Sequence, residues 1–248
     1  EAFMEPITWF LTGVEKHSDE RREDLLCNPE TFEGAMSHHM SRFEYESLYV
    51  AMNELSNHDH SRFLTRTNGQ VGRIQNKGTE AAEEGINEAV MREAVIMQMT
   101  WPGAPTVYYG DEVGVCGWTD PDNRRTYPWG HEDKQMLLFH KEAIRIHRNS
   151  TALCTGSYKM LYTAWGILAY GRFDEKERYT VIVNNTQDTV NVAIPVWQIG
   201  VTDGSRMEQQ LMSSSASFTK VPDIYVVTDG YLMIAMPKTS AVILKDIG

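Results

Sequence analysis

Apolar and polar positions follow two different periods along the chain, and the change falls near residue 150. Before that point, apolar residues recur at helical spacing over residues 86–97 and 136–147, and short apolar runs lie between. A spacing of three and four residues is typical of an amphipathic helix, whereas a short unbroken apolar run fits a strand covered on both faces. The first part of the chain is therefore predicted to alternate helices with buried strands.

Capping residues and breakers set the expected limits of these elements. Asn28 followed by Pro29 is a helix start, Thr79 is the expected cap of a later helix, and Trp101 to Gly103 ends that helix. The predicted helices cover residues 6–13, 28–46, 79–100 and 132–149, and the predicted strands cover 48–55 and 104–109. Polar segments at 15–24, 69–78 and 110–130 are expected to be solvated loops.

The second part of the chain predicts an antiparallel β-sandwich. Short apolar runs separated by turn residues begin after Gly156. The predicted strands are 157–162, 166–172, 179–184, 189–195, 231–236 and 239–245. We therefore expect an α/β domain over residues 1–150 and an all-β domain over residues 151–248.

Two predicted strands lead directly into acidic residues. The strand over 48–55 precedes Asn57, His58 and Asp59, and the strand over 104–109 precedes Asp111 and Glu112. A (β/α) barrel builds its active site from side chains at the C-terminal ends of its strands.

Composition narrows the class of partner. The 248 residues include 23 Lys and Arg against 34 Asp and Glu, which gives a net charge of -11 and argues against nucleic acid or an anionic membrane as a partner. No apolar stretch approaches the length of a membrane span. Three widely spaced cysteines, Cys27, Cys116 and Cys154, show no metal-ligand spacing, so no cofactor or metal is expected, and free thiols favour a cytoplasmic location.

Three motifs in order resemble the alpha-amylase family of glycoside hydrolases, in particular its neopullulanase and cyclomaltodextrinase branch. Residues 54–59, with Arg62 behind them, resemble the motif at the end of barrel strand seven. Residues 103–112 resemble strand eight, and residues 120–129 resemble the loop before the last barrel helix. The resemblance implies that residues 1–150 are the C-terminal part of a (β/α)8 TIM barrel and that residues 151–248 are the family's domain C.

The resemblance also implies roles for the residues after strand seven. Asp59 would stabilise the transition state by binding sugar hydroxyls beside the reacting carbon, and His58 and Asn57 would bind the same substrate. Without the family context, a His-Asp pair after a strand is more often a turn with a cap. The pair His60-Ser61 departs from the commoner Thr-Pro of the family.

Further positions carry a functional and a structural interpretation. Arg62 is expected among the substrate-binding residues, where it would hold a loop acid by a bidentate pair, or it would be a surface arginine. Asp120 with Arg124 would grip a more distant sugar or form a solvated ion pair. Glu112 and Tyr109 are expected to be structural residues near the site. Trp118 and Trp129 would either stack on sugar or pack the loop.

The family's nucleophile motif on strand four and its acid on strand five find no equivalent. The near match at 171–174 falls among the predicted β-strands and is accidental. We therefore expect a fragment, inactive alone, of a retaining hydrolase of α-1,4 bonds, with α-1,6 bonds as a further candidate. Maltodextrins, cyclodextrins and pullulan are the expected α-glucan substrates.

Two alternatives to hydrolysis remain. One is a transglycosylase or isomerase of the family, and the other is a non-catalytic sugar-binding protein. Open barrel edges predict that the chain associates with itself or with the missing half.

Overall fold

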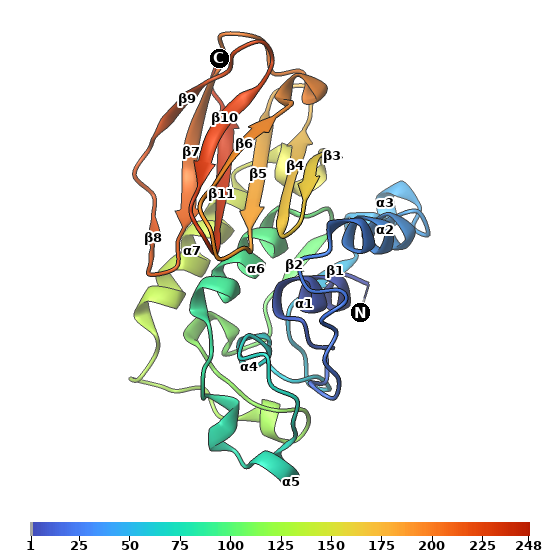
Figure 1. Ribbon diagram of the computed structural model, residues 1–248, viewed down its shortest axis with the longest axis vertical. Coiled ribbons are helices and arrows are strands. Elements are labelled where there is room, and N and C mark those ends of the chain that lie inside the picture. Colours follow the sequence, from blue (N-terminus) through green and yellow to red (C-terminus); the bar gives the residue numbers. More distant parts are fainter. Residues whose placement is uncertain (1) are drawn as a thin grey trace.

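The computed structural model describes residues 2–248 and divides into a helix-rich part and a β-rich part (Figure 1). The helix-rich part comes first along the chain, and its two short strands lie side by side among the helices. Its elements are α1 (Met4–Thr12), α2 (Pro29–Met40), α3 (Tyr45–Leu48), β1 (Met52–Glu54), α4 (Phe63–Arg66), α5 (Ile74–Lys77), α6 (Glu88–Thr100), β2 (Ala104–Thr106), α7 (Lys134–Arg148) and α8 (Thr151–Thr155).

Helix α2 begins where its sequence predicts and ends earlier. The Asn28 side chain accepts a hydrogen bond from the backbone N–H of Thr31 at 3.2 Å, and Pro29 occupies the first turn. The predicted extension to residue 46 is wrong, because the helix ends at Met40. The Ser41 hydroxyl donates to the carbonyl of His38 at 2.8 Å, a local bond that competes with continued helix.

Helix α6 begins nine residues later than its sequence predicts. Thr79 makes no capping hydrogen bond and precedes only the short 3₁₀ turn η1 (Glu80–Ala82). Asn87 is the true cap, since its side chain accepts from the backbone N–H groups of Ala89 and Val90. Gly85, which has a φ of 71°, separates the turn from the helix.

Strands β1 and β2 pair in parallel but are shorter than the predicted 48–55 and 104–109. Each contains three residues, with Met52 opposite Ala104. Asn53 lies at the centre of the pair and donates to the carbonyls of Trp101 and Pro102, both at 3.2 Å. A Cβ at Gly103 would lie 2.5 Å from the Asn53 side chain, and φ there is 137°, so this turn requires glycine.

The β-rich part contains two antiparallel sheets. The larger has the order β3-β4-β5-β11-β7-β8 with β9 also paired to β7, and the smaller is β10-β6. An apolar cluster that includes Ile182, Ile194 and Ile234 draws on both sheets. The strands are β3 (Ser157–Ala164), β4 (Ile167–Phe173), β5 (Arg178–Asn184), β6 (Val190–Ile194), β7 (Arg206–Ser213), β8 (Phe218–Thr219), β9 (Ile224–Val226), β10 (Leu232–Met236) and β11 (Ser240–Asp246); the sequence pattern missed β7, β8 and β9.

Helix α6 joins the two parts (Figure 1). At its end, the hydroxyls of Thr100 and Tyr170 lie 2.6 Å apart, and the buried Arg172 guanidinium donates to the Thr100 carbonyl at 2.6 Å. One apolar cluster contains residues of α6 and also Val181 and Ile243 of the large sheet. The core therefore runs across the boundary between the parts. Among residues 2–248, no helix is long and apolar enough to cross a membrane.

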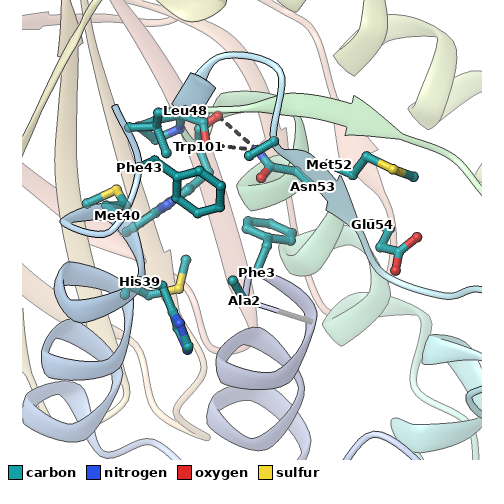
Figure 2. Close-up of a pocket in the computed structure, with 13 residues that line it drawn as sticks. Ala2, Phe3, His39, Met40, Phe43, Leu48, Met52, Asn53, Glu54 and Trp101 are labelled. Atoms are coloured by element: carbon teal, nitrogen blue, oxygen red, sulfur yellow. Dashed lines mark hydrogen bonds between the residues drawn. The ribbon is translucent and has the colours of Figure 1, made fainter. Parts of the chain in front are cut away.

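An apolar hollow lies at the outer edge of β1. It encloses about 330 Å³ and is lined by side chains from before α1, the end of α2 and β1, including Phe3, Met40 and Met52 (Figure 2). Within the described residues, β1 pairs with β2 alone. Beside it, Val50 is 72% exposed and Met52 is 57% exposed. An open strand edge next to exposed apolar side chains favours association.

We therefore predict that the chain associates in a concentration-dependent manner through this edge. Val50→Glu together with Met52→Lys should shift the population toward monomer in sedimentation velocity, because burying a charge at the contact is unfavourable. Val221→Glu, at a position that is 69% exposed in the β-rich part, is the matched control and should leave association unchanged. A wild-type chain that stays monomeric at every concentration would contradict this prediction.

A second unusual feature is the carboxyl group of Glu93 on α6. The residue is 0% exposed, and neither side-chain oxygen has a hydrogen-bond partner among the described residues. Burial raises the pKa of Glu93 well above its usual value, against the opposing charge of Arg92. The folded protein therefore retains a proton that the unfolded chain releases at about pH 4.3.

This difference between the folded and the unfolded pKa of Glu93 predicts that the protein loses stability as pH rises. Between the unfolded and the raised folded pKa, the folded state binds more protons, so the free energy of unfolding falls as pH rises, by at most about 1.4 kcal/mol per pH unit. Glu93→Gln removes that slope, and its stability relative to wild type should increase with pH in urea unfolding. Glu84→Gln, on the exposed surface, is the control. A stability difference that does not change with pH would show that Glu93 is not protonated in the fold.

Candidate functional site

The His58-Asp59 pair lies just past the C-terminal end of β1 and faces solvent. The two side chains are 63% and 64% exposed, and His58 Nε2 lies 3.4 Å from Asp59 Oδ1. Asn57 fixes the loop: its Nδ2 donates to Glu54 Oε1 at 2.7 Å, and its Oδ1 accepts from the Asp59 backbone N–H at 2.9 Å. Both ends of the Asn57 amide are thus hydrogen-bonded to neighbouring residues, while the Asp59 carboxylate stays available to a ligand.

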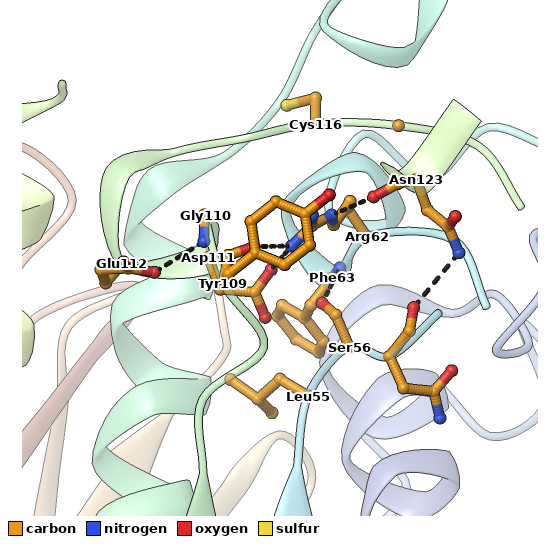
Figure 3. A network of polar contacts seen from close by, with 12 residues as sticks. Leu55, Ser56, Arg62, Phe63, Tyr109, Gly110, Asp111, Glu112, Cys116 and Asn123 are labelled. Carbon is orange, nitrogen blue, oxygen red and sulfur yellow. Dashed lines mark hydrogen bonds and ion pairs between the residues drawn. The ribbon is translucent and has the colours of Figure 1, made fainter. Parts of the chain in front are cut away.

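Arg62 is completely buried, and Figure 3 shows it among Tyr109, Asp111 and Asn123. Its Nε donates to the carbonyl of Asn123 at 2.8 Å, and its Nη1 donates to the carbonyl of Tyr109 at 2.6 Å and to Asp111 Oδ1 at 2.9 Å. The guanidinium also lies 4.1 Å from the centre of the Tyr108 ring, within cation–π range.

This geometry excludes a surface arginine and gives Arg62 a positioning role. The loop acid that it holds is Asp111, through Nη1 alone rather than through a bidentate pair. Burial raises the pKa of the Asp111 carboxyl, and the Arg62 charge opposes that rise. Because the Arg62 side chain has no exposed surface, it does not reach a ligand in this conformation, contrary to its predicted contact with substrate.

The loop over residues 110–130 is tied to the His58 loop by Asn123. Its Nδ2 donates to the carbonyl of His60 at 2.6 Å and to that of Asn57 at 3.2 Å. Asp120 and Arg124 form an ion pair on the same loop, with side chains 51% and 48% exposed. The structure therefore brings these two predicted residues together and leaves both accessible to a ligand.

The residues that directly follow β2 also make contacts with the loop over residues 110–130. Tyr109 donates its hydroxyl to the carbonyl of Arg125 at 2.9 Å, and Glu112 Oε2 accepts from the Gly110 backbone N–H at 2.8 Å. Both contacts are with backbone groups. Glu112 and Tyr109 thus bond to the backbone near the candidate site, and their structural role stays a prediction.

The two tryptophans of the loop differ completely in exposure. Trp118 is 0% exposed and donates its indole N–H to the carbonyl of Gly78 at 3.0 Å, so of its two interpretations packing of the loop is the one that fits. Trp129 is 79% exposed.

The near match to the nucleophile motif, at residues 171–174, falls at the end of β4. Its Arg172 is buried there.

Sequence reasoning missed the structural importance of Asp111 and Asn123. Asp111 directly follows an apolar strand, and this position could have identified it. The structural role near the site was instead predicted for its neighbour Glu112. Asn123 lies within the recognisable segment 120–129 and carries no charge, so nothing in its own type identified it. Among residues 2–248, no group of three or more His, Cys, Asp or Glu side chains is placed to hold a metal ion.

Comparison with known proteins identifies one family of relatives. The family model described as "Alpha amylase, catalytic domain" matches residues 8–222. The chain is 31% identical over 218 residues to an amylopullulanase of Thermoanaerobacter thermohydrosulfuricus, covering 84% of this chain and 14% of that protein. It is 35% identical over 139 residues to a cyclomaltodextrinase of Thermoanaerobacter pseudethanolicus, covering 55% of this chain and 21% of that protein.

Solved structures share the fold. An Anoxybacillus alpha-amylase superposes with a TM-score of 0.74 at 21% identity, covering 98% of this chain and 45% of that one. The chain thus spans less than half the length of these relatives. Since the family model matches most of the sequence, the chain belongs to the alpha-amylase family of glycoside hydrolases.

Proposed function

We propose that residues 1–150 form the C-terminal part of the catalytic (β/α)8 barrel of an α-glucan hydrolase and that residues 151–248 form its domain C. The observation that carries the proposal is the exposed His58-Asp59 pair at the C-terminal end of β1, beside the end of the parallel strand β2. Active sites of such barrels lie at this edge of the strands. A cytoplasmic location is part of the proposal and rests on the three free cysteines.

Asp59 is proposed to act on the transition state of a retaining cleavage. Such reactions pass through an oxocarbenium-like transition state, in which positive charge develops at the reacting sugar carbon. A carboxylate bound to the neighbouring hydroxyls gains interaction energy as that charge develops. Asn57 holds the loop in place, and His58 binds the same sugar from the adjacent position.

Retention also requires a nucleophile and a general acid roughly 5 Å apart, and these must come from elsewhere. Asp111 is buried against Arg62, and Glu112 is bonded to a backbone N–H. The family resemblance assigns the nucleophile and the acid to strands four and five, which this chain does not match.

The proposed substrates are maltodextrins, cyclodextrins and pullulan, cleaved at α-1,4 bonds, with α-1,6 bonds as a further candidate. The names of the relatives support this choice, since they include amylopullulanase, cyclomaltodextrinase and neopullulanase. Asp120 and Arg124 are proposed to bind a sugar farther along the chain through their exposed ion pair. A non-catalytic sugar-binding protein is the second candidate, favoured by the engaged state of Asp111 and Glu112.

The role of Asp59 predicts a specific loss of activity. In the product of the whole gene, Asp59→Asn should lower kcat on β-cyclodextrin and pullulan by about 10²- to 10³-fold, the range for loss of one transition-state contact. Thermal stability should be unchanged because the side chain is exposed. Asp203→Asn, on the exposed surface of the β-rich part, is the control. Unchanged kcat in Asp59→Asn would exclude the proposed role.

The absence of the strand-four and strand-five motifs predicts that residues 1–248 alone do not hydrolyse α-glucans. Reducing-sugar release from starch, β-cyclodextrin and pullulan by the purified chain should equal the solvent background. Release of maltose above background would show that the chain contains a complete catalytic pair. Glucan binding without cleavage by the product of the whole gene would instead favour the sugar-binding alternative.

A further inference from the structure

The segment over residues 15–19 belongs to a polar run expected to be solvated, but it is docked against the loop that carries Asp59. Ser18 and Ser61 are both 0% exposed, and their hydroxyl oxygens lie 2.9 Å apart. The Ser61 hydroxyl also donates to the carbonyl of Lys16 at 3.1 Å. Buried polar side chains are tolerated when they are hydrogen-bonded, so these contacts fix one segment against the other.

His17 and His60 form a second contact between the two segments. Their ring centres lie 4.5 Å apart, with a tilt of 47° between the ring planes. His60, which directly follows Asp59, is 4% exposed. Glu15 Oε1 accepts from the backbone N–H of His17 at 2.8 Å and from that of Asp19 at 2.7 Å. The His17 ring is therefore held in place and gives the His60 ring a fixed surface to pack against.

The hydrogen bonds of His60 connect it to Asp59 through one atom, Asn57 Oδ1. This oxygen accepts from the backbone N–H of Asp59 at 2.9 Å and from that of His60 at 3.1 Å, and it lies 2.7 Å from His60 Nδ1. Because two backbone N–H groups identify the Asn57 atom as an acceptor, His60 Nδ1 must carry a proton and donate to it. The loop thereby sets the tautomer of the His60 ring.

His60 is also held through its backbone, since Asn123 Nδ2 donates to the His60 carbonyl at 2.6 Å. It thus contacts residues 15–19, its own loop and the loop over residues 110–130. The Asp59 side chain, in contrast, is 64% exposed, so its orientation depends on the backbone that carries it. A carboxylate that meets a developing charge must be held in place beforehand, because small displacements at a reacting centre are costly in rate.

We propose that His60, packed on His17, is a positioning residue that sets the orientation of the Asp59 carboxylate toward the α-glucan. It acts through Asn57 Oδ1 rather than by touching the sugar, because its own side chain is buried. This inference rests on the proposed function and extends the site to residues 15–19. It also gives a role to the pair His60-Ser61, which departs from the commoner Thr-Pro of the family.

Loss of the His60 ring should lower kcat and leave KM unchanged. In the product of the whole gene, His60→Ala should lower kcat on β-cyclodextrin by about tenfold to a hundredfold, the range for a reacting group displaced by about 1 Å. KM should stay the same because the contact made by Asp59 matters mainly in the transition state. His60→Asn keeps an N–H at the position of Nδ1 and should retain most of kcat. His60→Gln moves the amide one carbon farther and should resemble His60→Ala.

Combining His60→Ala with Asp59→Asn tests whether His60 acts through Asp59. His60→Ala should cause almost no further loss of kcat once the carboxylate is gone, because residues that act as a unit are not additive. His17→Ala should cause a smaller loss of the same kind. His38→Ala is the matched control: it removes a second contact between histidine rings, 5.7 Å from His39 on α2, and should leave kcat unchanged.

Hydrogen exchange gives a readout that does not depend on activity. In the 248-residue chain, His60→Ala should speed exchange of the Asp59 backbone N–H by about tenfold, the change expected for loss of one hydrogen bond that steadies its acceptor. The measurement is NMR of the amide protons, and His38→Ala should again match wild type. Unchanged exchange at Asp59 in His60→Ala would show that His60 does not hold this loop.

The two proposals fail in different ways. If Asp59→Asn lowers kcat and His60→Ala does not, or if the two losses multiply in the double variant, His60 does not position Asp59 and the proposed function stands. If Asp59→Asn leaves kcat unchanged while His60→Ala speeds exchange at Asp59, the positioning of the loop stands and the proposed function fails. Should His60→Ala not fold, a higher kcat in His60→Asn than in His60→Gln supports positioning, and equal values overturn it.

Discussion

The candidate site depends on one buried cation. Arg62 connects three segments far apart in the sequence: its own loop, the residues after β2 that carry Tyr109 and Asp111, and the loop at Asn123. Removing a guanidinium from water is costly, and the partners around it offset that cost. Its Nη2 has no hydrogen-bond partner among the described residues, and the guanidinium carbon lies 4.1 Å from the centre of the Tyr108 ring. Loss of Arg62 would leave Asp111 buried and unpaired, so the loops around Asp59 would lose their shared anchor.

This dependence explains how much of the site the sequence could predict. The His58-Asp59 pair and the structural position of Glu112 depend on residues close by in the sequence, and motif spacing located them. The contacts of Arg62 with Asp111 and Asn123 join positions 49 and 61 residues apart. No local pattern carries that information, and Asn123 has no charge to draw notice. The burial of Trp118 and the exposure of Trp129, eleven positions apart on one loop, likewise follow from packing rather than from residue type.

The fold shows the same division between local and distant causes. The cap at Asn28, the end of α6 at Trp101 and six of the β-strands follow from short patterns of apolar, turn and capping residues. Helix limits were missed where a competing local bond decides them, as at Ser41 and Asn87. The strands β7, β8 and β9 were missed because polar residues interrupt their apolar pattern, and β7 is recognisable mainly from its pairing with β11.

The contact between α6 and β4 has a consequence for how the protein loses its structure. Thr100, Tyr170 and Arg172 meet where the helix-rich and β-rich parts share one apolar cluster, to which Tyr170 belongs. The sequence pattern changes near residue 150, but the two parts on either side of that change are not expected to unfold independently. Neither part can melt without exposing the apolar surface of the other, so the chain should unfold in a single transition. The β-rich part therefore packs against α6 and holds this helix in place. Through α6 it also supports β1 and β2, which lead to the candidate site.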